Sequence, residues 1–277
     1  MTSRPNEILV VGNYCHDTII TKDGSMFQGL GGSPAYISAI LSALGVQYEV
    51  IAKVGEDFRY MEQTPKKPRV ASGTATTAFL DDWRKGERIE TLQAQGTPIF
   101  AEDINTSAEI AICCGVMDEI KPETITAMRK NSKKLLCDMQ GLIRMAGDTG
   151  KVTYMPLEVT KHFSILNQID YLKASAVEAK LLNISAIRQK TNLIVTEGPQ
   201  GCTVYTRDGS FTVPGLPVKE KDSTGAGDSF LAGFAYGLLK GFDLKKAAKF
   251  ANFCGAVAVT QLGVPEISPD TFEAFVP

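Results

Sequence analysis

Residues in the spacings that bind a transition metal are scarce in this sequence. It has two histidines, His16 and His162, and none of its six cysteines forms a CxxC pair, so a zinc site of the common kinds is not expected. Most of the cysteines lie in apolar runs such as residues 110–114, where cysteine behaves as a small hydrophobic residue. This usage favours a reducing compartment, and we expect a cytoplasmic protein.

Long apolar stretches are also missing. No segment approaches the roughly 20 apolar residues that a membrane span needs, and the polar residues 1–7 lack the apolar core of a signal peptide. The formal net charge of -2 gives no general attraction to nucleic acids or acidic membranes. We therefore expect neither nucleic acid nor membrane as a partner.

Two common phosphate-binding motifs are absent. Residues 11–15, after the first predicted strand, lack GxGxxG, which argues against a dinucleotide oxidoreductase. A GxxxxGK[ST] loop does not occur either. A phosphate site in this chain therefore has to be made by another glycine-rich turn.

What the sequence does contain is an alternation of apolar runs and helical patterns. We expect buried strands at residues 8–11, 48–54, 110–114, 134–137, 169–173 and 193–196. Residues 33–44 predict a helix, with Ser33 as N-cap, Pro34 at the first helical position and Gly45 at its end. This alternation predicts an α/β fold with a mostly parallel central sheet and helices on both faces.

One region departs from that alternation. Residues 76–80 and 88–92 flank a polar turn at residues 84–87, which predicts a β-hairpin. With residues 18–20 and 26–30 it could form a small second sheet. Such a sheet could cap an active site, form a dimer interface or be a plain excursion. Its polar character favours a monomer over a dimer that uses this surface.

The most informative segment is residues 221–230. Gly225, Ala226 and Gly227 stand where a helix is predicted to begin, so unpaired N–H groups can hold an anion there. Asp228 follows in the first turn, where a carboxylate can accept a proton from an incoming hydroxyl. The alternative is an ordinary helix start, in which the glycines serve a tight turn and the aspartate complements the dipole.

Residues 222–233 resemble the C-terminal signature of the ribokinase-like (pfkB) carbohydrate kinase family. Four other segments resemble further motifs of that family in the expected order: residues 11–17, 31–45, 138–144 and 196–201. The resemblance implies one ribokinase-like domain over residues 1–277, with a small β-sheet lid from residues of about 14–30 and 71–98. Residues 12–17, 53–60 and 172–175 most resemble the plant inositol 3-kinase branch.

The resemblance also implies site residues. Asp228 would be the base, and Gly225, Ala226 and Gly227 the anion hole. The residues that would bind the acceptor are Asn13, Asp17, Gly31 and Gly32, together with Asp228. The residues that would bind the nucleotide are Lys173, Ser175, Thr196, Gly198, Gly201, Asn252 and Ala256. Glu178 would act on Mg²⁺ through water, and a monovalent cation such as K⁺ would lie near Asp222, Thr224, Ala258 and Gly263.

The implied function is ATP-dependent phosphorylation of a polyol hydroxyl, with myo-inositol as the expected acceptor. Another sugar or a nucleoside is the alternative acceptor, and a catalytically silent regulator is the alternative class. We expect ATP and Mg²⁺ as cofactors, and a monomer or weak homodimer.

Three positions complicate this prediction. Ser175 stands where the family usually has the asparagine of an NxxE motif, and Tyr36 stands where it usually has an asparagine that reaches the sugar. Tyr36 should therefore reshape the acceptor pocket. Arg144 could be a phosphate ligand or a structural partner of Asp138.

Overall fold

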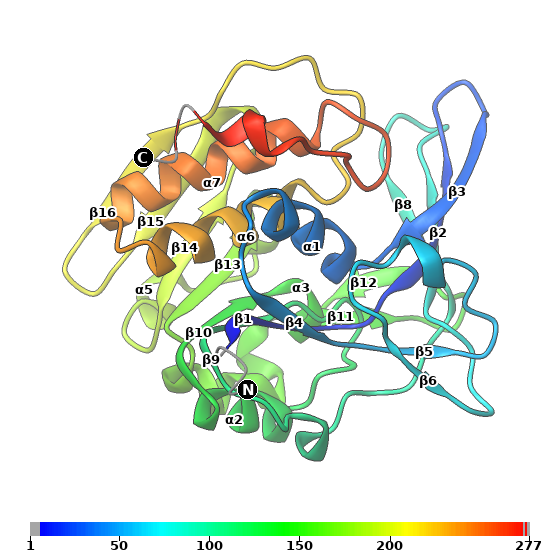
Figure 1. Ribbon diagram of the computed structural model, residues 1–277, viewed down its shortest axis with the longest axis horizontal. Helices are drawn as coiled ribbons and strands as arrows, with labels where there is room; N and C mark the ends of the chain where they lie inside the picture. Colours follow the sequence, from blue (N-terminus) through cyan, green and yellow to red (C-terminus); the bar gives the residue numbers. More distant parts are fainter. Residues whose placement is uncertain (1–5, 274, 276–277) are drawn as a thin grey trace.

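Eight strands form the central sheet of the computed structural model, which describes residues 6–273 and 275 (Figure 1). They are β1 (Asn6–Val11), β4 (Tyr48–Ile51), β9 (Ala108–Cys113), β10 (Ser132–Asp138), β13 (Tyr171–Ser175), β14 (Asn192–Thr196), β15 (Gly201–Tyr205) and β16 (Ser210–Pro214). Their order is β16-β15-β14-β13-β10-β9-β1-β4. The strands from β14 to β4 are parallel, and β15 and β16 add an antiparallel edge. The predicted mostly parallel sheet is confirmed.

Helices cover both faces of this sheet. Helices α1 (Ser33–Ala43), α6 (Ala226–Leu239) and α7 (Leu244–Ala258) lie on one face, and α2 (Pro122–Lys130) with the short α5 (Ile184–Ile187) lies on the other (Figure 1). Strand β1 shows why two cores form: Ile8 and Val10 belong to the first core, and Leu9 and Val11 to the second. Successive side chains of a strand point to opposite faces, so a strand buried on both sides reads as a continuous apolar run.

A second sheet of four strands lies beside the central one (Figure 1). It consists of β2 (Cys15–Ile20), β3 (Met26–Gly31), β7 (Ala78–Asp82) and β8 (Ile89–Ala94), in the order β3-β2-β7-β8. We call it the lid sheet. The hairpin predicted from residues 76–92 is confirmed as β7 and β8, and its pairing with the earlier hairpin runs through parallel strands β2 and β7.

The smaller elements connect these layers. They are β5 (Lys53–Gly55), β6 (Arg69–Ala71), β11 (Arg144–Ala146), β12 (Val152–Tyr154), α3 (Gln140–Ile143), α4 (Ala176–Ala179) and the 3-10 turns η1 (Met61–Gln63), η2 (Ala101–Asp103), η3 (Leu157–Val159), η4 (Lys161–Gln168), η5 (Gly198–Gln200) and η6 (Pro269–Phe272). The β11–β12 hairpin holds the lid sheet, because the Leu92 N–H donates to the Gly150 carbonyl at 2.8 Å.

Two local predictions are wrong. The apolar run 48–54 is not one strand: it divides at Ala52 into β4 of the central sheet and β5, which pairs with β6. Ser33 is not the cap of α1, since the helix is capped by Gly32 with φ 85°. The Ser33 hydroxyl instead accepts a hydrogen bond from Gln140 Nε2 at 2.9 Å. Within the described part of the chain, no helix is both long and apolar enough to cross a membrane.

Candidate active site

A narrow cavity of about 70 Å³ lies between the lid sheet and the central sheet. We call it the inner cavity. It is lined by Cys15, Asp17, Phe79, Arg88 and Glu90 from the lid side and by Gly32, Ser33, Tyr36, Val116, Gln140, Arg144, Thr224, Gly225 and Asp228 from the main body. Asp17 and Asp228, which are 211 positions apart in the sequence, therefore face one cavity.

Asp228 stands in the first turn of α6. The helix is capped by Gly225 in the left-handed conformation at φ 74°, which glycine adopts without steric cost. A Cβ at Gly225 would overlap the ring of Tyr36. Asp228 Oδ1 is buried and accepts no hydrogen bond from the described residues. An unpaired buried acceptor is uncommon in folded proteins, and this one is available to a ligand's hydroxyl.

The surroundings of the two carboxyl groups make them weak acids. Burial and the nearby Asp138 carboxylate raise the pKa of Asp228 to about 6, against the opposing charge of the Lys173 ammonium. Burial and the neighbouring Asp81 carboxylate raise the pKa of Asp17 to about 7, against the opposing charge of Arg88. Carboxyl groups of this kind are suited to accept a proton near neutral pH.

The two glycines before α1 define the position of Asp17. A Cβ at Gly31 would overlap the Asp17 carboxylate, so the side chain can lie there only because Gly31 has none. Gly32 lines the inner cavity beside it. Asn13 does not line that cavity. Its amide donates to the Thr97 carbonyl at 2.9 Å and its Oδ1 accepts from the Lys53 N–H at 2.8 Å. The Asn13 side chain therefore links the backbone at Thr97 to the backbone at Lys53.

Lys173 joins strand β13 to the start of α6. Its Nζ lies 2.8 Å from Asp138 Oδ2, and a Cβ at Gly227 would overlap that same Nζ. The Asp138, Glu178 and Asp228 charges together raise the pKa of Lys173 against the effect of burial. A buried ammonium therefore stands beside the N–H groups of the helix start, of which that of Ala226 donates to the Ser223 carbonyl at 3.3 Å. The ammonium and the positive end of the helix both attract an anion.

Charged residues of the lid hairpin were missed by the sequence analysis. Glu90 Oε1 accepts from Arg88 Nη2 at 2.9 Å and from Arg144 Nη1 at 3.1 Å. Arg144 does not pair with Asp138, which binds Lys173 instead, so the proposed structural partnership between them is wrong. The alternation of Arg88 and Glu90 indicates a shared face of the hairpin, but the sequence does not tell that this face is turned inward.

A separate pocket of about 190 Å³ lies between η5, the loop before α6, and α7. The predicted residues Thr196, Gly198, Gly201, Asn252 and Ala256 all line it. Its apolar walls come from Pro199, Leu216, Pro217, Val218, Phe230 and Val259. Asn252 also shapes this pocket, because its amide donates to the Val213 and Pro214 carbonyls at 3.1 Å each. We call it the apolar pocket.

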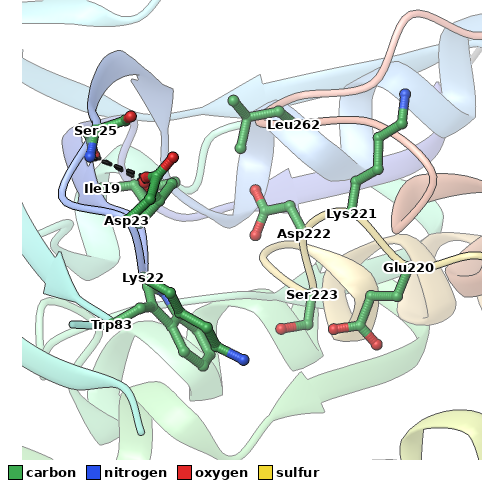
Figure 2. A pocket seen from close by; sticks show the side chains of 11 residues that line it. Ile19, Lys22, Asp23, Ser25, Trp83, Glu220, Lys221, Asp222, Ser223 and Leu262 are labelled. Carbon is green, nitrogen blue, oxygen red and sulfur yellow. Dashed lines mark hydrogen bonds between the residues drawn. The ribbon is translucent and has the colours of Figure 1, made fainter. Parts of the chain in front are cut away.

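An outer cleft of about 560 Å³ lies along the edge of the lid sheet. Trp83 and Lys22 project into it from the lid, opposite Ser223 and Glu220 on the loop before α6 (Figure 2). Ser223 and Glu220 also line the apolar pocket. The cleft therefore adjoins the apolar pocket, with the lid tip on its far side.

Ser175 and Glu178 bind each other at the start of α4. Glu178 Oε2 accepts from the Ser175 N–H at 2.7 Å and from its hydroxyl at 2.8 Å, and Ser175 Oγ accepts from the Glu178 N–H at 3.3 Å. This is a capping box. The other oxygen of Glu178 makes no hydrogen bond to a described residue, so the carboxylate keeps one free face.

Asp222 organises the loop before α6. Its Oδ1 accepts from the Thr224 N–H at 2.9 Å and its Oδ2 from the Gly263 N–H at 3.1 Å. The structure thus brings three of the four predicted cation ligands together. The Ala258 carbonyl, the fourth, accepts from the Gln261 N–H at 3.3 Å.

Comparison with known proteins decides the family. The model of the pfkB family carbohydrate kinases matches residues 101–271. The chain belongs to this family. As a pfkB carbohydrate kinase it is an enzyme that transfers a phosphoryl group to a small-molecule hydroxyl, and the family implies a nucleotide donor and a divalent metal.

Individual relatives agree with this assignment. The pfkB kinase described here is 35% identical to inositol 3-kinase of Arabidopsis thaliana over 95% of this chain and 76% of the relative. It is 36% identical to inositol 3-kinase of Oryza sativa subsp. japonica over 97% of this chain and 72% of the relative. The fold matches a pyrophosphate-dependent kinase of the ribokinase family, solved with a pyrophosphate analogue and myo-inositol, at TM-score 0.83 and 21% identity over 96% of this chain and 99% of that one.

Proposed function

We propose that this kinase transfers the γ-phosphate of ATP to a hydroxyl of a ring polyol, with myo-inositol as the acceptor. The named activity of the two plant relatives supports the choice of acceptor. The observation that carries the proposal is the buried, unpaired Oδ1 of Asp228, which faces the inner cavity together with Asp17. Carboxylates in an enclosed site can hold adjacent hydroxyls, which an apolar pocket cannot do.

The reaction follows from this arrangement. The acceptor hydroxyl lies in the inner cavity and gives its proton to Asp228 as its oxygen attacks the γ-phosphorus. The bond from that phosphorus to the bridging oxygen of ATP breaks, and the electron pair leaves with ADP. The N–H groups of residues 225–227 and the Lys173 ammonium hold the charge that develops on the phosphoryl oxygens.

The apolar pocket supports a nucleotide as donor. Its walls of proline, leucine, valine and phenylalanine side chains suit an adenine ring. Pyrophosphate has no apolar group that could contact these walls. The loop with Ser223 separates this pocket from the outer cleft, so a triphosphate can extend from the adenine toward the start of α6. Asn252 and Ala256 of α7 would flank the base.

The residues present fit a magnesium ion held largely through water. Among residues 6–273 and 275 there is no group of three or more His, Cys, Asp or Glu side chains that could cage a metal. Mg²⁺ bound to ATP usually keeps several of its waters and needs few protein ligands. The free oxygen of Glu178 would orient those waters, and the ion would neutralise charge on the donor phosphates when bound.

We extend the proposal to a monovalent cation, K⁺, at the loop that Asp222 organises. Carbonyl and carboxylate oxygens of Asp222, Thr224, Ala258 and Gly263 would be its ligands. The ion would stabilise the loop that leads into residues 225–227. Replacing K⁺ by a large organic cation in the assay should then lower kcat.

The lid sheet completes the proposed enzyme. We propose one kinase domain over residues 1–277, in which segments 14–30 and 71–98 form a lid that excludes water from the transfer. We also propose a monomer or weak homodimer in the cytoplasm, which sedimentation and cell fractionation would test. Six free, buried cysteines support the cytoplasmic location.

An acceptor screen tests the proposed function. Purified protein is assayed with ATP or pyrophosphate against myo-inositol, fructose, ribose and inosine, with the product identified by NMR. We expect turnover with ATP and myo-inositol that exceeds the other pairs. Preferential turnover of a nucleoside, a furanose or pyrophosphate would contradict it.

A further inference from the structure

Glu90 is held between two arginines on the lid side of the inner cavity. Both Arg88 and Arg144 donate to the same oxygen, Oε1, at 2.9 and 3.1 Å. Arg88 is fixed in turn by Asp81, which accepts from its Nε at 2.9 Å and from its Nη2 at 2.8 Å. The side chains of Glu90 and Arg144 are each only 8% exposed. The Arg88 side chain is more open, at 34% exposed, so the pair of Glu90 and Arg144 is the buried part of the network.

The network leaves several polar atoms without a partner. Arg144 Nε is buried and makes no hydrogen bond to a described residue. Glu90 Oε2 and Arg88 Nη1 also make no hydrogen bond to a described residue. The side chains of Arg88, Glu90 and Arg144 all line the inner cavity. A buried unused donor, with a further donor and an acceptor on the same cavity wall, indicates a ligand that has both kinds of group.

Arg144 contributes to the lid side of the inner cavity, which Gly225 and Asp228 also line. Arg144 lines the inner cavity and not the apolar pocket. At the start of α6 the adjacent cation is Lys173. The guanidinium of Arg144 thus faces the acceptor side, where the lid carboxylate binds it.

We propose that Glu90, positioned by Arg88 and Arg144, recognises ring hydroxyls of the acceptor other than the one phosphorylated. This inference rests on the proposed function and specifies its selectivity. Each hydroxyl of a ring polyol is both a donor and an acceptor, so adjacent hydroxyls pair with a carboxylate oxygen and a guanidinium N–H side by side. A site built this way rejects an analogue that lacks a hydroxyl, because its own buried polar groups then stay unpaired.

A purely structural role for Glu90 predicts something different. The ion pair with Arg144 also links the lid to β11, and its loss could simply loosen the lid. However, the backbone hydrogen bond from Leu92 to Gly150 at 2.8 Å fastens the same strand independently. We therefore expect a Glu90→Gln variant to fold, with a melting temperature that serves as the check.

The test combines variants with acceptors that lack one hydroxyl. Wild type and Glu90→Gln are assayed with myo-inositol and with monodeoxy-inositols, each missing a different hydroxyl. We expect Glu90→Gln to raise KM for myo-inositol by about 10-fold or more while kcat changes less. For one or two of the deoxy compounds Glu90→Gln should leave KM almost unchanged, because the hydroxyl that Glu90 would contact is already absent. An equal loss for every acceptor would mean a structural role and would overturn the inference.

Two controls complete the design. Glu87→Gln makes the same change at an exposed position of the same hairpin and should leave every acceptor unaffected. Arg144→Lys keeps the charge but loses the planar guanidinium with its paired N–H donors. It should therefore raise KM for the same acceptors as Glu90→Gln does. If wild type phosphorylates no polyol, the proposed function fails. If wild type is active but Glu90→Gln keeps full discrimination, only the present inference fails.

Discussion

The Lys173 ammonium lies against Gly227 at the start of α6, so close that a Cβ on the glycine would overlap Nζ. Lys173 is the middle residue of β13, in a buried run of that strand, and Gly227 is the second residue of α6, more than 50 positions later. The fold thus brings a cation from a buried strand to the N–H groups of a helix start. This contact places positive charge beside Asp228 on the phosphate side.

Lys173→Met should slow the chemical step. The variant removes positive charge from the transferring phosphoryl group, so we expect kcat to fall by about 10². It should also raise the pKa of Asp228, because Lys173 lowers that pKa in the folded protein. The acid limb of the pH–rate profile should then move to higher pH. The control is Lys180→Met, at an exposed position at the end of the following helix. If the acid limb of the pH–rate profile does not move in Lys173→Met, the account is contradicted.

The pH dependence of the wild type follows from the raised carboxyl pKa values. The base must be ionised to accept a proton, and burial raises the pKa of Asp228 to about 6 and that of Asp17 to about 7. Activity should therefore be constant above neutral pH and fall as the pH drops through this range. Measurement of kcat/KM between pH 5 and 9 checks this; full activity at pH 5 would disprove it.

Gly31→Ala should weaken binding of the acceptor and leave binding of the nucleotide unchanged. The added Cβ would overlap the Asp17 carboxylate and force it out of the inner cavity. We expect KM for the polyol to rise by about 10-fold or more, with the Kd for ATP unchanged by calorimetry. Gly209→Ala is the matched control, since its Cβ would meet no heavy atom within 4 Å. Unchanged polyol affinity in Gly31→Ala would refute the role of Asp17.

Trp83 should report on ligand binding at the lid. It is the single tryptophan of the chain, and it projects into the outer cleft opposite Ser223 (Figure 2). Addition of polyol and ADP together should change its fluorescence, because ligands near that cleft alter its contact with water. Trp83→Phe should abolish the signal. A constant emission while calorimetry registers binding would mean that the lid tip does not respond.

The sequence predicted the central sheet well because its strands are buried on both faces and read as apolar runs. The turn at Gly225 and the position of Asp228 could also be predicted, since local helix-start chemistry determines them. The break at Ala52 could not be predicted, because residues 48–54 form one apolar run and nothing in that run marks where the chain passes from one sheet to another. The ion pair between Glu90 and Arg144 could not be predicted either, because it depends on how the lid sheet packs onto the main body.

The central claim is that Asp228 takes the proton from the acceptor hydroxyl. Single-turnover phosphorylation of myo-inositol by Asp228→Asn, with ATP and polyol binding measured separately by calorimetry, tests it most directly. We predict a rate lowered by about 10²-fold or more, with both Kd values within about threefold of wild type. A variant that phosphorylates myo-inositol at nearly the wild-type rate would contradict the account.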